Sequence, residues 1–167
     1  MISKSDFVAR FGGIFEHSPW VAERAFDRDG SIAQTVEAVH AALVAAFRAA
    51  AEAERLAVLR AHPDLAGKLA IAGALTEDSK AEQASAGLDR LTPAEHTRFT
   101  ELNDAYTEKF GFPFIIAVKG LGKDDILEAF ERRIDNNPQE EFEAASAQVE
   151  RIALLRLRSM LAGEENA

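Results

Sequence analysis

The residue best suited to proton-transfer chemistry is His62, within the stretch Arg60-Ala61-His62-Pro63-Asp64. A helical pattern of apolar residues leads into this stretch, and Pro63 disfavours helical geometry in the residue before it. We therefore expect His62 at or just past a helix end, on a chain reversal where its imidazole can face a cavity. The ordinary pKa of histidine lies near neutrality, which suits an acid/base. A structural interpretation stays open, because the helix dipole also favours histidine at a helix C-terminus.

A second chemical candidate is Arg156, which falls on the apolar stripe of the last helical stretch. The earlier positions on this stripe follow spacings of three and four and are Phe142, Ala145, Val149 and Ile152. A buried guanidinium is costly unless an anion pairs with it. One interpretation is a salt bridge to an internal carboxylate, or a side chain that extends to solvent. The other is an anionic ligand, because arginine presents fixed donors that match carboxylates and carbonyls.

A third group of polar residues shares one face of a predicted helix over residues 79–88. Ser79, Glu82, Gln83 and Ala86 follow the spacing i, i+3, i+4 and i+7. Hydroxyl, carboxylate and amide groups together offer donors and acceptors suited to an amide-like or urea-like ligand. The alternative is that this face is solvated, as in many short polar helices.

The elements that must position these residues are predicted to be helices. Thr92-Pro93-Ala94-Glu95 predicts a capping box, and Asn137-Pro138-Gln139-Glu140 opens the longest predicted helix. Ser31 is expected to cap another long helix. Residues 112–118 have strand propensity but no partner strand, so we expect a buried extended segment. The fold class is all-α, one domain over residues 1–167 with its core at about 5–161 and about seven to eight helices.

Composition narrows the classes of function. The net charge is −9 without a compact basic stripe, so a nucleic-acid partner is not expected. No apolar run reaches the ~20 residues that a membrane helix needs, and the N-terminus lacks a signal-peptide pattern. The sequence has no cysteine, which excludes disulfides and thiolate chemistry. The histidines are too scattered for a metal site. We expect a cytoplasmic protein with no membrane partner.

Several stretches together resemble one family, in order along nearly the whole chain. They are Phe11-Gly12-Gly13-Ile14-Phe15-Glu16-His17-Ser18-Pro19-Trp20, Arg60 to Ala66, Leu75 to Leu88 with Ser79 and Glu82-Gln83, Leu102-Asn103 with Tyr106, Lys109-Phe110-Gly111-Phe112-Pro113-Phe114, and Ile152 with Arg156-Leu157. The sequence is similar to the OHCU decarboxylases. The resemblance implies an all-helical fold and a decarboxylation of 2-oxo-4-hydroxy-4-carboxy-5-ureidoimidazoline to (S)-allantoin in urate breakdown, without a cofactor or metal.

The resemblance also implies roles for individual residues. The family's essential histidine corresponds to His62, and Glu82 and Arg156 complete the expected catalytic set. The expected substrate-binding residues are Pro63, Ser79, Gln83 and the segment Phe114, Ile115, Ile116, Ala117 and Val118, whose backbone would contact the substrate. The expected partner is the small-molecule substrate, and the chain is expected to form a homodimer.

Two other functions remain open at this point. A non-catalytic helical interaction module could have the same fold, although it would have no reason to keep His62, Glu82, Gln83 and Arg156 together. A related decarboxylase or lyase could act on another ureido acid. The division of acid/base roles between His62 and Glu82 is not settled by sequence.

Overall fold

The computed structural model describes residues 1–165, which form nine helices and no strand. The helices are α1 (Lys4–Phe11), α2 (Trp20–Arg28), α3 (Val36–Ala49), α4 (Glu52–Ala61), α5 (Lys68–Ile71), α6 (Glu77–Ser85), α7 (Pro93–Phe110), α8 (Lys123–Arg133) and α9 (Pro138–Glu165). The prediction of an all-α fold is confirmed. The chain divides into two compact units, residues 1–61 with 149 onward, and residues 62–148. The expectation of one domain over residues 1–167 stays a prediction.

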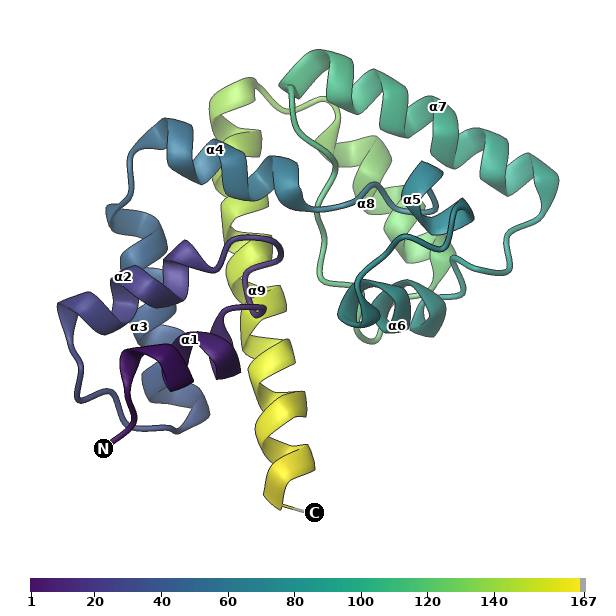
Figure 1. Ribbon diagram of the computed structural model, residues 1–167. Coiled ribbons are helices and arrows are strands. Elements are labelled where there is room, and N and C mark those ends of the chain that lie inside the picture. The colour runs from purple at the N-terminus through teal and green to yellow at the C-terminus, as the bar shows by residue number, and fades with distance from the viewer. Residues whose placement is uncertain (166–167) are drawn as a thin grey trace. The chain divides into compact units, whose positions relative to one another are not determined.

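In the first unit, α2 packs against both α1 and α3 (Figure 1). Their core is rich in phenylalanine: the Phe7 and Phe11 ring centroids are 5.0 Å apart, and those of Phe15 and Phe47 are 5.3 Å apart. All four side chains are at most 2% exposed. Burying each aromatic side chain stabilises the fold by roughly 1.5–3 kcal/mol, so this cluster holds the unit together.

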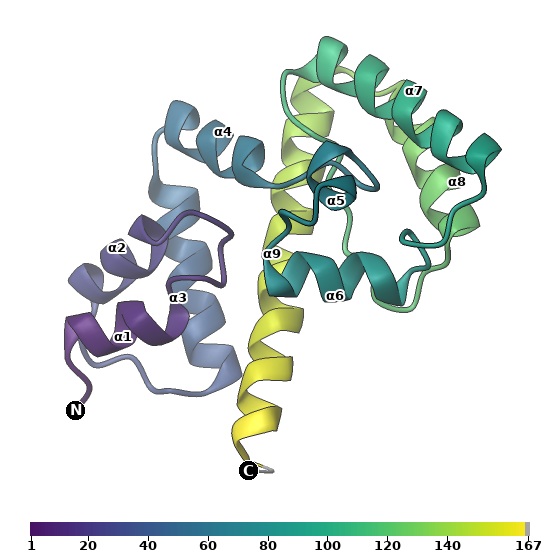
Figure 2. The ribbon, with the colours of Figure 1, turned by 45° about the vertical axis from the view of Figure 1, so that its right-hand side comes forward.

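In the second unit, α7 and α8 lie side by side, and the connection between them is an extended run (Figures 1 and 2). The predicted capping box opens α7: the Thr92 side chain accepts from the Glu95 amide, and the Glu95 carboxylate accepts from the Thr92 amide. Gly111 ends α7 at a φ of 79°, the left-handed conformation that glycine adopts without a Cβ penalty.

The prediction that Ser31 caps a helix is wrong. The helix begins at Val36, and the Thr35 side chain caps it by accepting from the Ala38 amide. Ser31 instead donates its amide and its hydroxyl to the Asp29 carboxylate, at 2.9 and 2.5 Å. This local turn satisfies the Ser31 amide outside a helix, which is how short polar side chains compete with helical structure.

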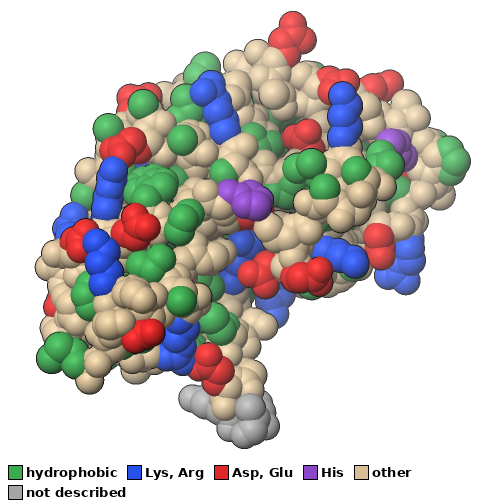
Figure 3. All heavy atoms as spheres, in the orientation of Figure 1, with side chains coloured by type: hydrophobic (Ala, Val, Ile, Leu, Met, Phe, Trp, Pro, Cys, Tyr) green, Lys and Arg blue, Asp and Glu red, His purple; other side chains and the backbone are tan. Residues whose placement is uncertain are grey.

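The surface carries charges of both signs. Acidic and basic side chains are interspersed on the face that Figure 3 shows. Within the described part of the chain, no helix combines the length and the apolar composition needed to cross a bilayer.

A buried ionic network lies within the largely apolar core of the second unit. Glu141 on α9 is fully buried and accepts from the Tyr106 hydroxyl at 2.6 Å, from Arg133 Nε at 2.8 Å and from Asn136 Nδ2 at 3.1 Å. A carboxylate removed from water is tolerated only when such donors surround it. The network therefore joins α7, α8 and α9 at one point.

We predict that the stability conferred by the Tyr106 hydroxyl is lost at high pH. Burial, and then the hydrogen bond to Glu141, raise the pKa of Tyr106 well above its ordinary value of 10.0. The folded protein thus keeps this proton where the unfolded chain loses it, so the contribution is complete below pH 10 and falls as the pH rises above it. Tyr106→Phe should lower the free energy of unfolding by about 2 kcal/mol at neutral pH.

Urea unfolding of both proteins across the alkaline range should show this difference shrinking. Tyr106 is the single tyrosine of the sequence, so the tyrosinate absorbance band reports it alone. An ordinary tyrosine titration in the folded protein would contradict the prediction.

Candidate active site

The predicted position of His62 at a helix end is confirmed. Helix α4 ends at Ala61, and His62 follows directly, before Pro63. The His62 side chain belongs to the second unit and is only 8% exposed, whereas Pro63 is half-buried. The imidazole is thus placed on an irregular loop and shielded from bulk water.

The loop after Pro63 holds a strained conformation. Ala66 has a φ of 52°, the left-handed region that residues with a Cβ seldom adopt. At Gly67, a Cβ atom would lie 2.6 Å from the Cβ of Asp64, so this position requires glycine for a close approach of the chain to itself. Such strain persists only where the surrounding structure imposes it, and it is concentrated at functional sites.

Two buried amide side chains hold this loop. Gln83 on α6 accepts from the Ala66 amide at 2.9 Å and donates to the Asp64 carbonyl at 3.2 Å. Asn103 on α7 donates to the Leu65 carbonyl at 2.9 Å. Gln83 and Asn103 are each 5% exposed. Three successive residues after Pro63 are therefore fixed by side chains, and the backbone that carries His62 is fixed with them.

The polar face of α6 points into the protein. Ser79 is 5% exposed, as are Gln83 and Ala86, and Glu82 is half-buried. The interpretation that this face is solvated is therefore wrong for Ser79 and Gln83. The Thr76 side chain caps α6 by accepting from the Ser79 amide, which fixes the start of the helix.

The acid next to the histidine loop has a shifted pKa. Burial raises the pKa of Asp64, the nearby Asp104 raises it further, and Lys68 opposes the shift. The loop therefore presents a carboxyl group that is less readily ionised than a surface aspartate.

The predicted extended segment is also confirmed: residues 113–118 form neither helix nor strand. Phe114, Ile115, Ala117 and Val118 are buried, and Ile116 is half-buried. Arg133 donates to the Ile115 carbonyl at 2.7 Å, and the Ala117 amide donates to Gln148 Oε1 at 2.9 Å. Side chains thus supply the hydrogen-bond partners that a sheet would otherwise provide.

Arg156 belongs to the first unit, where it is 7% exposed. One of its terminal nitrogens lies 3.9 Å from the Glu16 carboxylate, which is 2% exposed, and the other donates to the Ile14 carbonyl at 3.4 Å. The internal salt bridge considered from the sequence is therefore present, although both contacts are long. Its catalytic role stays a prediction.

The sequence interpretation missed Asn103, Arg133, Glu141 and Gln148. A signal existed for two of them: Arg133 lies seven residues after Ile126 on the buried stripe of α8, and Glu141 lies four residues before Ala145 on that of α9. A charged residue on an apolar stripe was the signal used for Arg156. Asn103 lies four residues after Phe99 on the buried stripe of α7, and Gln148 lies three residues after Ala145 on α9, but a neutral amide on such a stripe is a weaker signal than a charge. In residues 1–165, no three or more His, Asp or Glu side chains gather as metal ligands would.

Comparison with known proteins agrees with the resemblance. The family model described as OHCU decarboxylase matches residues 1–158. The 2-oxo-4-hydroxy-4-carboxy-5-ureidoimidazoline decarboxylase of Haloferax volcanii is 42% identical over 98% of this chain and 94% of its own length. The mouse protein of the same name is 32% identical over 97% of this chain and 90% of its own.

Solved structures show the same fold. The crystal structure of (S)-allantoin synthase, at 34% identity, superposes with a TM-score of 0.75 over 95% of this chain and 50% of that chain. An OHCU decarboxylase crystallised in the presence of (S)-allantoin, at 21% identity, superposes with a TM-score of 0.69 over 96% of this chain and 99% of that one. The match of sequence along nearly the full length, together with the shared helical fold, shows that the chain belongs to the OHCU decarboxylase family and is a carboxy-lyase.

Proposed function

We propose that this enzyme converts 2-oxo-4-hydroxy-4-carboxy-5-ureidoimidazoline to (S)-allantoin and carbon dioxide during urate breakdown. The observation that carries the proposal is the buried His62 on a loop that Gln83 and Asn103 hold in place. Membership of the family supplies the substrate class. A relative named uric acid degradation bifunctional protein, from Bacillus subtilis, is 38% identical over 90% of this chain and 29% of its own length, and its name supports the pathway.

The substrate itself explains why the reaction needs no cofactor. Its carboxylate lies next to a ring C=N bond, which accepts the electron pair when the bond to the departing carbon dioxide breaks. This internal electron sink takes the place of an organic cofactor. The enzyme must then orient the substrate, stabilise charge and deliver one proton to one face of the ring.

We assign the acid/base role to His62, which handles the proton of the 4-hydroxyl group or protonates the ring carbon after decarboxylation. Glu82 orients His62 or binds the hydroxyl and ureido N–H groups. Arg156 binds a carboxylate or carbonyl oxygen and stabilises charge in the transition state. A histidine protected from bulk water is suited to deliver a proton to one face, since water cannot compete for the intermediate.

The binding roles are assigned to Pro63, Ser79, Gln83 and the backbone of residues 114–118. Gln83 has the capacity for two tasks. A primary amide carries two N–H donors and an oxygen with two lone pairs, and the loop contacts of Gln83 use one donor and one lone pair. The remaining groups suit the ureido part of the substrate.

A decarboxylase acting on another ureido acid is the alternative that the same site chemistry allows. The polar face of α6 would suit any ureido group, so the substrate has to be established by assay. A non-catalytic module is disfavoured, since it would have no reason to keep His62, Glu82, Gln83 and Arg156 together.

We also propose that the enzyme acts in the cytoplasm as a homodimer. A chain without cysteine fits a reducing compartment. Leu69 and Ile71 on α5 are 51% and 70% exposed, and apolar surface of this kind is what a contact between two copies requires.

The first test is a coupled assay in which uricase and hydroxyisourate hydrolase supply fresh substrate. We expect rapid appearance of the circular dichroism of (S)-allantoin, because uncatalysed decay gives a racemic product without a signal. Slow racemic decay with a folded sample would overturn the proposed function. A thermal-shift screen with allantoin and other ureido acids would then identify the ligand class.

The second test replaces His62 by asparagine. General acid/base catalysis contributes about 10²–10⁴-fold, so His62→Asn should lower kcat by that factor while the melting temperature stays close to that of the wild type. The matched control is His17→Asn: His17 is exposed and has a φ of 52°, a conformation that asparagine tolerates. Equal turnover in the two variants would exclude His62 as the acid/base.

The third test is the mass of the wild-type protein by sedimentation equilibrium. We expect twice the 18.2 kDa of one chain. A monomer at the concentrations used for the activity assay would contradict the homodimer.

A further inference from the structure

We infer that Arg133 and Gln148 are positioning residues that hold the backbone of residues 114–118 in its ligand-binding conformation. This inference rests on the proposed function, because it takes residues 114–118 as the stretch that contacts the substrate. Arg133 holds the Ile115 carbonyl from α8, and Gln148 holds the Ala117 amide from α9.

The two contacts leave the residue between them in a defined orientation. In extended backbone, the N–H and C=O groups of residues i and i+2 point to one side, and those of residue i+1 point to the other. The Ile115 carbonyl and the Ala117 amide, which this alternation assigns to one side of the chain, are both bonded to side chains. The same alternation assigns the N–H and C=O groups of Ile116 to the other side. Ile116 is also the half-buried member of an otherwise buried stretch.

Arg133 is itself held rigidly enough to serve this purpose. Its Nε and Nη2 atoms lie 2.8 and 2.6 Å from one oxygen of the fully buried Glu141, which also accepts the Tyr106 hydroxyl. Its guanidinium carbon lies 4.4 Å from the centre of the Phe114 ring, which stacks on Phe130 at 4.0 Å. The guanidinium therefore contacts the segment through both a ring face and a carbonyl.

Gln148 provides the sharper experiment, since it is half-buried and holds the segment through a single hydrogen bond at 2.9 Å. Gln148→Leu removes the acceptor for the Ala117 amide, while Gln148→Glu keeps an acceptor oxygen at the same position. Removing Arg133 instead would leave Glu141 buried without its main partner and would threaten folding.

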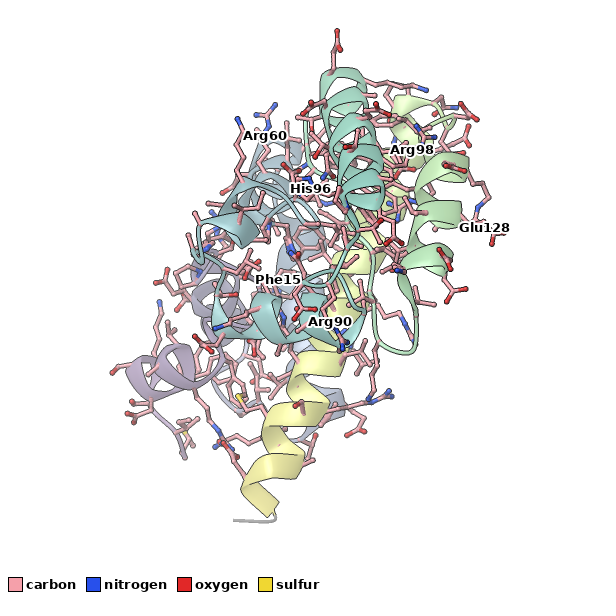
Figure 4. The ribbon with its side chains drawn as sticks, turned by 90° about the vertical axis from the view of Figure 1, so that its right-hand side faces the viewer. Phe15, Arg60, Arg90, His96, Arg98 and Glu128 are labelled. Atoms are coloured by element: carbon pink, nitrogen blue, oxygen red, sulfur yellow. The ribbon has the colours of Figure 1, made fainter. Side chains whose placement is uncertain are left out.

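The matched control is Arg98→Gln. Arg98 projects from α7 toward α8 and pairs with Glu131 at 3.0 Å (Figure 4). The two side chains of this pair are 47% and 52% exposed, so the loss of the pair should change neither folding nor activity measurably.

The test combines steady-state kinetics with amide hydrogen exchange of a peptide that covers residues 112–118. Gln148→Leu should exchange faster in this peptide and raise KM about fivefold to tenfold, the effect of one lost hydrogen bond. Gln148→Glu and Arg98→Gln should resemble the wild type in both measurements. A purely structural role would lower the melting temperature without raising KM.

Each outcome decides a separate question. Unchanged exchange and unchanged KM in Gln148→Leu would overturn the inference. Faster exchange with unchanged KM in an active enzyme would also overturn it, since the held conformation would then not matter for the substrate. Failure of the proposed function is distinguishable, because the wild-type protein itself would then lack decarboxylase activity. In that case, the affinities of the wild type and of Gln148→Leu for (S)-allantoin are compared by calorimetry. This comparison of affinities then takes the place of the comparison of KM values.

Discussion

The burial of one carboxylate, that of Glu141, is the constraint on which the second unit depends. A fully buried carboxylate needs several donors, and the chain supplies them from α7, α8 and the turn before α9. Arg133, which donates to Glu141, also donates to the Ile115 carbonyl. The same ionic network that joins the helices therefore fixes a stretch of backbone assigned to the substrate.

A ligand site built from backbone groups, as proposed for residues 114–118, poses a particular difficulty in an all-α protein. Helical peptide groups are already used, so the binding backbone must be irregular, and irregular buried backbone needs hydrogen-bond partners. This chain meets the need with side chains. Gln83 and Asn103 hold the loop after Pro63, and Arg133 and Gln148 hold the extended segment. Polar side chains on helices thus supply the backbone hydrogen-bond partners that neighbouring strands supply in a sheet.

The sequence predicted the parts of this structure that depend on local rules. Pro63 predicts the end of a helix, Thr92 predicts a helix cap, and residues 112–118 are predicted to lack a partner strand. The structure agrees with all three predictions. The prediction for Ser31 is wrong because its amide and its hydroxyl both donate to the carboxylate of Asp29, two residues earlier, and Thr35 caps the helix instead. His62, Glu82 and Arg156 are assigned from residue type and family resemblance, and their catalytic roles stay predictions.

What the sequence did not predict depends on contacts between distant residues. Gln83 could be placed on a helical face, but that it holds Ala66 depends on where α6 packs in three dimensions. Asn103 contacts a residue thirty-eight positions earlier, and no local pattern marks such a pair. Arg133 lies on the apolar stripe of α8, but its contact with the Ile115 carbonyl, eighteen positions earlier, depends on how α8 packs against the extended segment.

The tethered loop has a consequence for the thermodynamics of ligand binding. Ordering a flexible loop on binding costs conformational entropy and gives a large negative change in heat capacity. Here the hydrogen bonds that hold residues 64–66 join protein groups to one another. The entropy of that loop is therefore lost during folding, and the binding free energy is available for recognition of the substrate. Association should then resemble entry into a rigid site, with a small change in heat capacity and no slow conformational phase.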